Sequence, residues 1–200
     1  MSNLCTEILQ YQQTSLINDQ DKPNEYGLDV SCNLGSLDIH EATKVKDFEK
    51  LVNTSMRLLT SVSEMTNIVN VPSVAKANKL MHSVGLGAMN LHGHLATQNI
   101  HYGSADSVTF TDKFFEAVNY YSLKTSMLIA KEKGETFHQY EKSDYASGIY
   151  FDKYVNKSDE DVNEVVRGAL GNIPLITSDM WKELKSDVMK YGIYHSYRLA

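Results

Sequence analysis

The sequence predicts an α/β fold that is mostly helical, with a strand near each end of its 200 residues. Three observations support this prediction. Residues 27–39 alternate apolar and polar side chains, residues 193–200 read as another extended segment, and apolar residues between them recur at every third or fourth position. Strands that alternate with helices favour an α/β arrangement. Because an end strand sits at a sheet edge, we expect strands at both ends to require pairing partners.

The first expected element is a short extended run over residues 3–7. Alternate side chains of a strand share one face, about 7 Å apart, so Asn3, Cys5 and Glu7 would line one surface. An amide, a thiol and a possible general base would then lie side by side. For an arbitrary pattern of this kind, the simpler interpretation is a small buried cysteine beside a solvated carboxylate.

A second strand is expected over residues 27–39, bounded by glycines. The side chains that alternate on its apolar face are Leu28, Val30, Cys32 and Leu34. We therefore expect Cys32 to point inward. The polar residues 19–25 read as a loop that lets the two cysteine strands lie side by side.

Three helices are predicted from apolar residues at helical spacing. They cover residues 45–69, ended by Pro72; residues 104–134, between a serine cap and a glycine; and residues 177–192, between a threonine cap and a glycine.

Composition limits the possible partners and compartments. The chain has 25 acidic and 19 basic residues and a formal net charge of -6, so no basic stripe is available for a nucleic-acid backbone. We expect neither direct nucleic-acid binding nor membrane insertion. Two cysteines without a signal peptide predict a soluble, cytoplasmic protein in a reducing compartment, where neither thiol forms a structural disulfide.

Several motifs are interpreted as structural. Gly85 and Gly87 precede a helical stretch, but Asn90 replaces the third glycine of a dinucleotide-binding fingerprint, so close packing is the favoured explanation. His92 and His94 would face different sides of a helix and would not share a metal. A set of tyrosines could carry a radical, but core and groove filling is favoured for Tyr120, Tyr121, Tyr140, Tyr145, Tyr150 and Tyr154.

Seven blocks of sequence occur in the order typical of one enzyme family. The first contains the motif Ser2-Asn3-Leu4-Cys5, and the last ends in Tyr197-Arg198-Leu199-Ala200. The blocks are residues 2–7, 27–39, 71–79, 85–93, 130–137, 150–155 and 194–200. Over nearly the whole chain they resemble the large (alpha) subunit of class Ib ribonucleotide reductase.

The resemblance implies a fold and a role for each candidate residue. Residues 1–200 would be part of a single catalytic barrel domain, incomplete at both ends, within a ten-stranded α/β barrel. Cys5 would become a thiyl radical that removes the ribose 3′ hydrogen, while Glu7 acts as base toward the 3′-hydroxyl. Asn3 would position the ribose hydroxyls. Cys32 would be one of the two cysteines that reduce the 2′ carbon, its partner being absent from this chain.

Partners and cofactors follow from the same resemblance. The chain itself would bind no metal or cofactor. A metal-containing small (beta) subunit would supply the radical, a redoxin-type dithiol would re-reduce the cysteines, and the substrate would be a ribonucleoside diphosphate. The remaining large-subunit segments would be required, in a large subunit that is homodimeric when complete. We therefore expect the isolated chain to be inactive.

Two other interpretations remain open. The chain could be a catalytically inactive fragment or assembly module of a split or interrupted reductase gene. An unrelated helical binding protein would require the ordered blocks to be coincidental.

Overall fold

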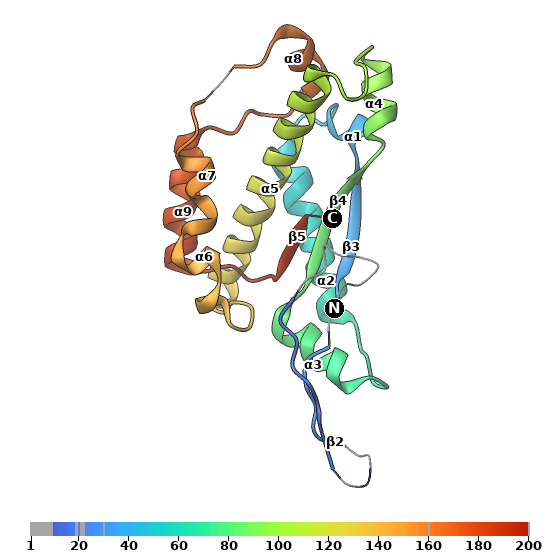
Figure 1. The fold of residues 1–200 in the computed structure, drawn as a ribbon, viewed down its shortest axis with the longest axis vertical. Coiled ribbons are helices and arrows are strands. Elements are labelled where there is room, and N and C mark those ends of the chain that lie inside the picture. The colour runs from blue at the N-terminus through green and yellow to red at the C-terminus, as the bar shows by residue number, and fades with distance from the viewer. Residues whose placement is uncertain (1–9, 19, 21–22, 30, 160, 200) are drawn as a thin grey trace.

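The computed structural model describes residues 10–18, 20, 23–29, 31–159 and 161–199 (Figure 1). Its main sheet has three parallel strands in the order β3 (Asn33–Asp38), β4 (Val84–Met89) and β5 (Tyr197–Leu199). β3 pairs with β4 from Asn33 opposite Val84 to Asp38 opposite Met89, and β5 pairs along the first half of β4. The expected α/β arrangement, mostly helical, is therefore present. The strand expected to be unpaired at the C-terminal end, β5, pairs with β4 on one side, and in the described part of the chain its other side is a sheet edge.

Helices connect the parallel strands, as such crossovers require. Between β3 and β4 lie α1 (Ile39–Ala42), α2 (Phe48–Met65) and α3 (Pro72–Met81). Between β4 and β5 lie α4 (Leu91–Thr97), α5 (Ala105–Lys133), η1 (Tyr140–Lys142), α6 (Asp144–Ser147), η2 (Ile149–Phe151), α7 (Asp152–Val155), α8 (Glu164–Leu170) and α9 (Ser178–Tyr191).

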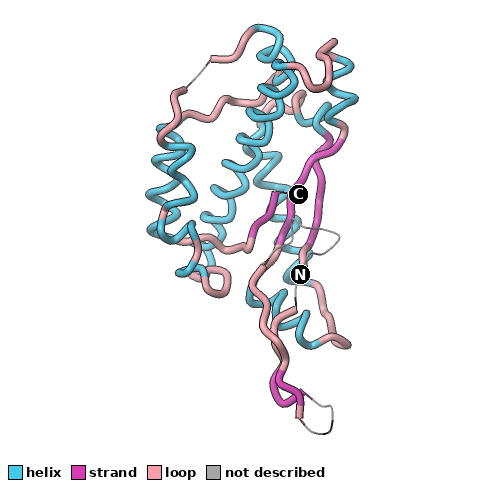
Figure 2. The backbone as a smooth tube through the Cα atoms, viewed as in Figure 1, coloured by secondary structure: helices cyan, strands magenta, loops and turns pink. Residues whose placement is uncertain are grey.

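The elements form three layers, with α5 in the middle (Figure 1). α2 packs on β3 and β4, α5 packs on α2, and α9 covers the opposite side of α5. Phe110, Phe114 and Val118 of α5 are fully buried in one core that extends from Val84 of the sheet to Trp181 of α9. Outside this body, β1 (Leu16–Ile17) and β2 (Pro23–Glu25) form a small antiparallel hairpin that projects at one end (Figure 2).

The predictions for α5 and α9 are confirmed at both ends of each helix. The Ser104 hydroxyl accepts a hydrogen bond from the Ser107 amide at 3.2 Å, and Gly134 adopts the left-handed conformation directly after α5. Thr177 caps α9 through the Met180 amide at 3.3 Å, and Gly192 follows its last residue. These caps satisfy backbone groups that a helix end leaves without partners.

The predicted helix over residues 45–69 is wrong at both ends. α2 begins at Phe48 because the Asp47 carboxylate caps the Lys50 amide at 2.9 Å. It ends at Met65, and Val69 lies in an exposed connection. Pro72 does not end this helix but begins α3, at a position where an amide hydrogen is not needed.

The predicted apolar face of the strand over residues 27–39 is also wrong in part. Leu28 is buried in an isolated bridge with Gln13, but regular pairing begins only at Asn33. Leu34 is 53% exposed, whereas Leu37 is 8% exposed. The inward face is therefore the one that carries Gly35 and Leu37, because α2 packs on that side, with Leu59 close to Gly35.

Candidate functional site

The structure places one of the four predicted site residues. Cys32 directly precedes β3 and is half-buried. Asn3, Cys5 and Glu7 lie outside the described residues, so a shared surface for all four side chains stays a prediction. In an extended chain, Cys32 falls on the same side as Leu34 and Ser36, which is the side facing away from α2.

Hydrogen bonds hold the residues on both sides of Cys32. The Ser31 carbonyl accepts from the Gln10 side-chain amide at 3.1 Å. Asn33 donates twice to the Ser83 carbonyl, from its backbone at 3.1 Å and from its side chain at 3.0 Å. The thiol thus sits on a segment anchored to the stretch that leads into β4, at the end of the sheet where the strands begin.

One face of the sheet carries exposed apolar groups. Leu34 of β3 and Met89 of β4 lie on the same face and are 53% and 56% exposed. In the described part of the chain, no helix packs on this face of β3 in the way that α2 packs on the other. A sheet face that no helix covers and that carries two large apolar side chains is a candidate surface for contact with other protein.

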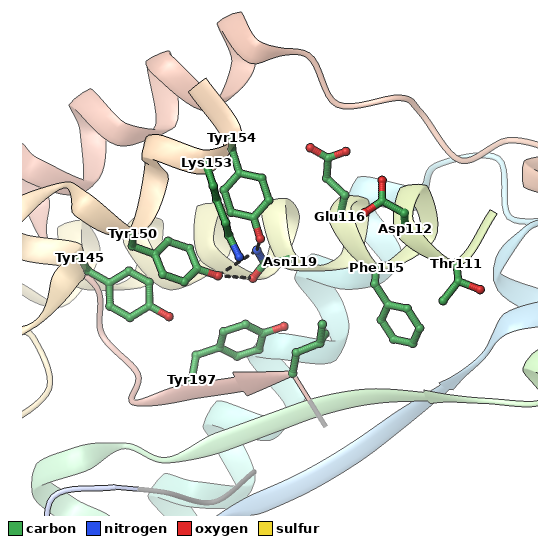
Figure 3. Close-up of a pocket in the computed structure, with 11 residues that line it drawn as sticks. Thr111, Asp112, Phe115, Glu116, Asn119, Tyr145, Tyr150, Lys153, Tyr154 and Tyr197 are labelled. Carbon is green, nitrogen blue, oxygen red and sulfur yellow. Dashed lines mark hydrogen bonds between the residues drawn. The ribbon is translucent and has the colours of Figure 1, made fainter. Parts of the chain in front are cut away.

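A cavity of 480 Å³ lies beside β5 (Figure 3). Residues of α5, η2, α7 and β5 line it, with Tyr197 facing Asn119 and Tyr150 across the opening. The Asn119 side chain donates to the hydroxyls of Tyr150 and Tyr154, both at 3.0 Å, and accepts from Tyr150 at 3.1 Å. Burial raises the pKa of Tyr150 to about 12, so this phenol stays neutral at physiological pH.

The wall of this cavity continues into a buried ionic cluster. Glu116 of α5, 6% exposed, accepts a hydrogen bond from the Trp181 indole at 2.9 Å and another from Lys157. Its second oxygen lies 3.9 Å from the Lys113 ammonium. Glu116 turns away from Tyr197, and the two lysines compensate its buried charge (Figure 3).

The polar side chains of α5 that line this cavity were not predicted as a site, although their spacing is visible in the sequence. Asp112, Glu116 and Asn119 recur at helical spacing within a run whose other side chains are mainly apolar. The prediction that tyrosines fill the core is confirmed for Tyr120 and Tyr121, which are 5% and 6% exposed.

The two histidines of α4 occupy separate environments. His94 is buried, with Nε2 3.0 Å from the Ala169 carbonyl oxygen and Nδ1 3.2 Å from Nδ1 of His40. Burial lowers the pKa of His94. The His92 ring instead lies beside Tyr102. Within the described ranges, no group of three or more His, Cys, Asp or Glu side chains is arranged to hold a metal ion.

None of the described helices combines the length and the apolar character needed to cross a membrane.

The model of a family described as "Ribonucleotide reductase, barrel domain" matches residues 1–200. The chain belongs to this family. In a barrel domain each strand has an outer and an inner face. Because helices surround the strands of an α/β barrel, we expect the face of β3 and β4 that α2 covers to be the outer one and the face with Leu34 to be the inner one.

Individual relatives of this reductase barrel domain carry related names. The chain is 50% identical over 199 residues to "Ribonucleoside-diphosphate reductase subunit alpha" of Bacillus subtilis, covering 100% of this chain and 28% of the relative. It is 47% identical to the "nrdEB subunit alpha" of Bacillus phage SPbeta, covering 98% of this chain and 18% of the relative. For the alpha subunit of Mycoplasma pneumoniae the identity is 39%, covering 100% and 28%. The chain therefore spans less than a third of the length of these relatives.

Proposed function

We propose that this chain is part of the large subunit of a class Ib ribonucleoside-diphosphate reductase, an enzyme that makes deoxyribonucleotides for DNA synthesis. Residues 1–200 would be part of one catalytic barrel domain in the cytoplasm. The observation that carries the proposal is the family match over residues 1–200, which includes both cysteine segments. The alpha-subunit names of the relatives support it.

The radical chemistry is assigned to the first cysteine segment. The Cys5 thiyl radical takes the 3′ hydrogen of the ribose, which leaves a thiol and a carbon radical. Glu7 accepts the proton of the 3′-hydroxyl, and Asn3 holds the ribose hydroxyls without competing for protons. The hydrogen returns from Cys5 to the 3′ carbon at the end, so the thiyl radical is regenerated.

Cys32 is assigned to the reducing step. It and a second cysteine outside this chain together supply two electrons and two protons, the 2′-hydroxyl leaves as water, and the two thiols become a disulfide. A redoxin-type dithiol then reduces that disulfide. The anchored segment around Cys32, at the end of the sheet where the strands begin, supports this role because a reducing thiol must be held at a fixed place.

The partners follow from the incomplete coverage of the relatives. The substrate is a ribonucleoside diphosphate, and a metal-containing small subunit supplies the radical. The remaining large-subunit segments complete the barrel, and the complete large subunit forms a homodimer. The alternative proposal is a catalytically inactive fragment or assembly module of a split reductase gene, which the exposed inner face of the sheet also favours.

The test combines this chain with the missing parts. The chain is co-expressed with polypeptides that supply the remaining large-subunit sequence of the Bacillus subtilis relative, and is then mixed with a small subunit and a dithiol. Loss of tritium from the 3′ position of a labelled ribonucleoside diphosphate reports radical abstraction, and deoxyribonucleotide formation reports reduction. We expect both in the assembly and neither with the isolated chain.

Two variants separate the roles of the thiols. Cys5→Ser should abolish tritium release and product, whereas Cys32→Ser should retain release but not productive reduction. Equal loss of tritium release in both variants would contradict the separate roles. A correctly folded assembly that releases no tritium and makes no product would favour the assembly module.

A further inference from the structure

Asn78, on α3, connects three parts of the fold. Its side chain is buried, at 6% exposure. Its oxygen accepts hydrogen bonds from the Ser63 hydroxyl at 3.1 Å and from the Asn33 side-chain amide at 3.2 Å. Its nitrogen donates to the Ser63 carbonyl at 2.8 Å. One amide therefore joins α3 to α2 by two hydrogen bonds and to the beginning of β3 by a third.

The contacts of Asn78 with the strand lie on both sides of Cys32. Asn33 follows the cysteine, and Ser31, which precedes it, has its hydroxyl 3.5 Å from the same Asn78 oxygen. Gln10 and Ser83 hold the same two flanking residues from other directions. Asn78 differs from both because it belongs to one helix, α3, and is hydrogen-bonded to a second, α2, through Ser63.

We propose that Asn78 is a positioning residue for Cys32. It sets the place of the thiol by holding the segment 31–33 against the pair of helices α2 and α3. The inference rests on the reducing role proposed for Cys32. Asn78 acts through Asn33 and Ser31, so it is not itself a catalytic residue.

The chemistry of the side chain explains why an amide is used here. The position requires one donor, toward the Ser63 carbonyl, and an acceptor for two or three donors. A carboxylate of the same shape would lose the donor and place a charge in a buried site. A leucine would fill the volume but leave the Ser63 hydroxyl without this acceptor.

The consequence for the thiol is local. Without Asn78, Asn33 retains its bonds to Ser83, so the strand pairing persists while the segment before it gains freedom. A group that takes part in chemistry must be held within roughly 0.5 Å of its productive place. Loss of one tether should therefore change the exposure of Cys32 more than it changes the fold.

The experiment measures the thiol directly and does not depend on reductase activity. In a Cys5→Ser background only Cys32 can react with iodoacetamide, and its alkylation rate is followed by mass spectrometry on the folded 200-residue chain. Asn78→Ala and Asn33→Ala should each raise this rate about tenfold. Because both substitutions remove the hydrogen bond between Asn33 and Asn78, the double variant should fall well short of the product of the two single effects.

A matched control removes a different amide bridge. Asn53 donates to the Thr125 hydroxyl at 3.3 Å and joins α2 to α5 without contacting residues 31–33. Asn53→Ala should lower stability in urea without changing the Cys32 alkylation rate by more than about twofold. If Asn78→Ala does not fold, Asn33→Ala carries the test, because its side chain is only half-buried.

Two outcomes would overturn the inference. One is an alkylation rate in folded Asn33→Ala and Asn78→Ala equal to that of the parent. The other is an equal increase in the alkylation rate of Asn53→Ala, which would show general loosening of the fold.

In the complemented assembly, Asn78→Ala should lower kcat for deoxyribonucleotide formation with an unchanged KM and unchanged 3′ tritium release. An assembly that is inactive even with Asn78 intact would count against the proposed function, while the alkylation result would still decide the role of Asn78.

Discussion

Nδ1 of the buried His195 lies 2.8 Å from the hydroxyl oxygen of Ser126. On the other side of the ring, Nε2 lies 2.9 Å from the Thr60 hydroxyl, which already donates its proton to the Met56 carbonyl at 2.7 Å. Thr60 can therefore only accept, so Nε2 carries the ring proton and Nδ1 accepts from Ser126. A second ring proton would point at the Ser126 hydroxyl, and burial lowers the pKa of His195 to about 3.

His195 should make the folded state sensitive to acid. Its pKa is lowered on folding, so the unfolded chain binds more protons between about pH 6.5 and pH 3. The stabilising contribution is complete above that window and falls by up to about 1.4 kcal/mol per pH unit as the pH decreases through it. His195→Gln should be less stable than the parent at pH 7.5, and this difference should shrink as the pH falls from 6.5 to 4.5. Urea unfolding at several pH values measures it, and a constant difference would contradict the assignment.

Gly171→Ala should be much more destabilising than Gly103→Ala. Both glycines have positive φ, 57° and 84°, so alanine is strained by about 1 kcal/mol or more at either position. An added Cβ at Gly171 would also lie 2.5 Å from the Thr43 carbonyl oxygen, while at Gly103 it would meet nothing within 4 Å. We expect a loss of at least about 3 kcal/mol for Gly171→Ala in thermal or urea unfolding. Similar losses for the two variants would show that the close approach to Thr43 is not rigid.

The two faces of β3 should respond differently to the same substitution. Leu37→Ser removes a core side chain and should cost about 2–5 kcal/mol of unfolding free energy. Leu34→Ser should leave the stability of the isolated chain within about 0.5 kcal/mol, because Leu34 is exposed there. In the complemented assembly, Leu34→Ser should weaken association, measured by co-purification. Unchanged association would show that this face is not covered by the other segments.

Glu7→Gln should separate catalysis from folding. In the complemented assembly it should slow turnover by roughly 10²- to 10⁴-fold at saturating substrate, the range typical of losing a general acid or base. The matched control is Glu41→Gln, because the Glu41 side chain is 69% exposed and pairs with the exposed Lys44 on the surface. Turnover of the control should stay within about twofold. If Glu7→Gln turned over as fast as the parent, its carboxylate would not be the base.

Local signals explain which elements the sequence could predict. α5 and α9 were placed correctly because Ser104, Gly134, Thr177 and Gly192 act within a few residues of the helix ends. The ends of α2 were predicted wrongly. Asp47 caps the helix, but apolar residues before Phe48 and after Met65 continue the same spacing. The inward face of β3 depends on where α2 packs, which is a long-range fact.

The candidate site also has a part that the sequence could predict and a part that it could not. The alternation of residues 27–39 predicted a strand at Cys32 with the thiol pointing inward, but regular pairing begins one residue later and the cysteine falls on the side facing away from α2. Its neighbours could not be predicted. Asn78 is far from Cys32 in the sequence, and no spacing rule links an asparagine in one helix to a serine in another. The part that concerns Asn3, Cys5 and Glu7 stays a prediction.

The strand order also determines how this chain must fold. Asn33, Val84 and Tyr197 are neighbours across the sheet, yet they come from early, middle and late parts of the sequence. Contacts between distant positions form slowly, since the entropy of closing the intervening loops is lost before any pairing compensates it. During synthesis, β3 and β4 can pair, with α2 packed on them, long before β5 is made. The surface of α5 that α9 and Tyr197 cover in the finished fold stays exposed until those later residues are synthesised. A ribosome that pauses after α5 would therefore hold a chain whose central helix is still exposed, and we expect chaperones to bind it at that stage.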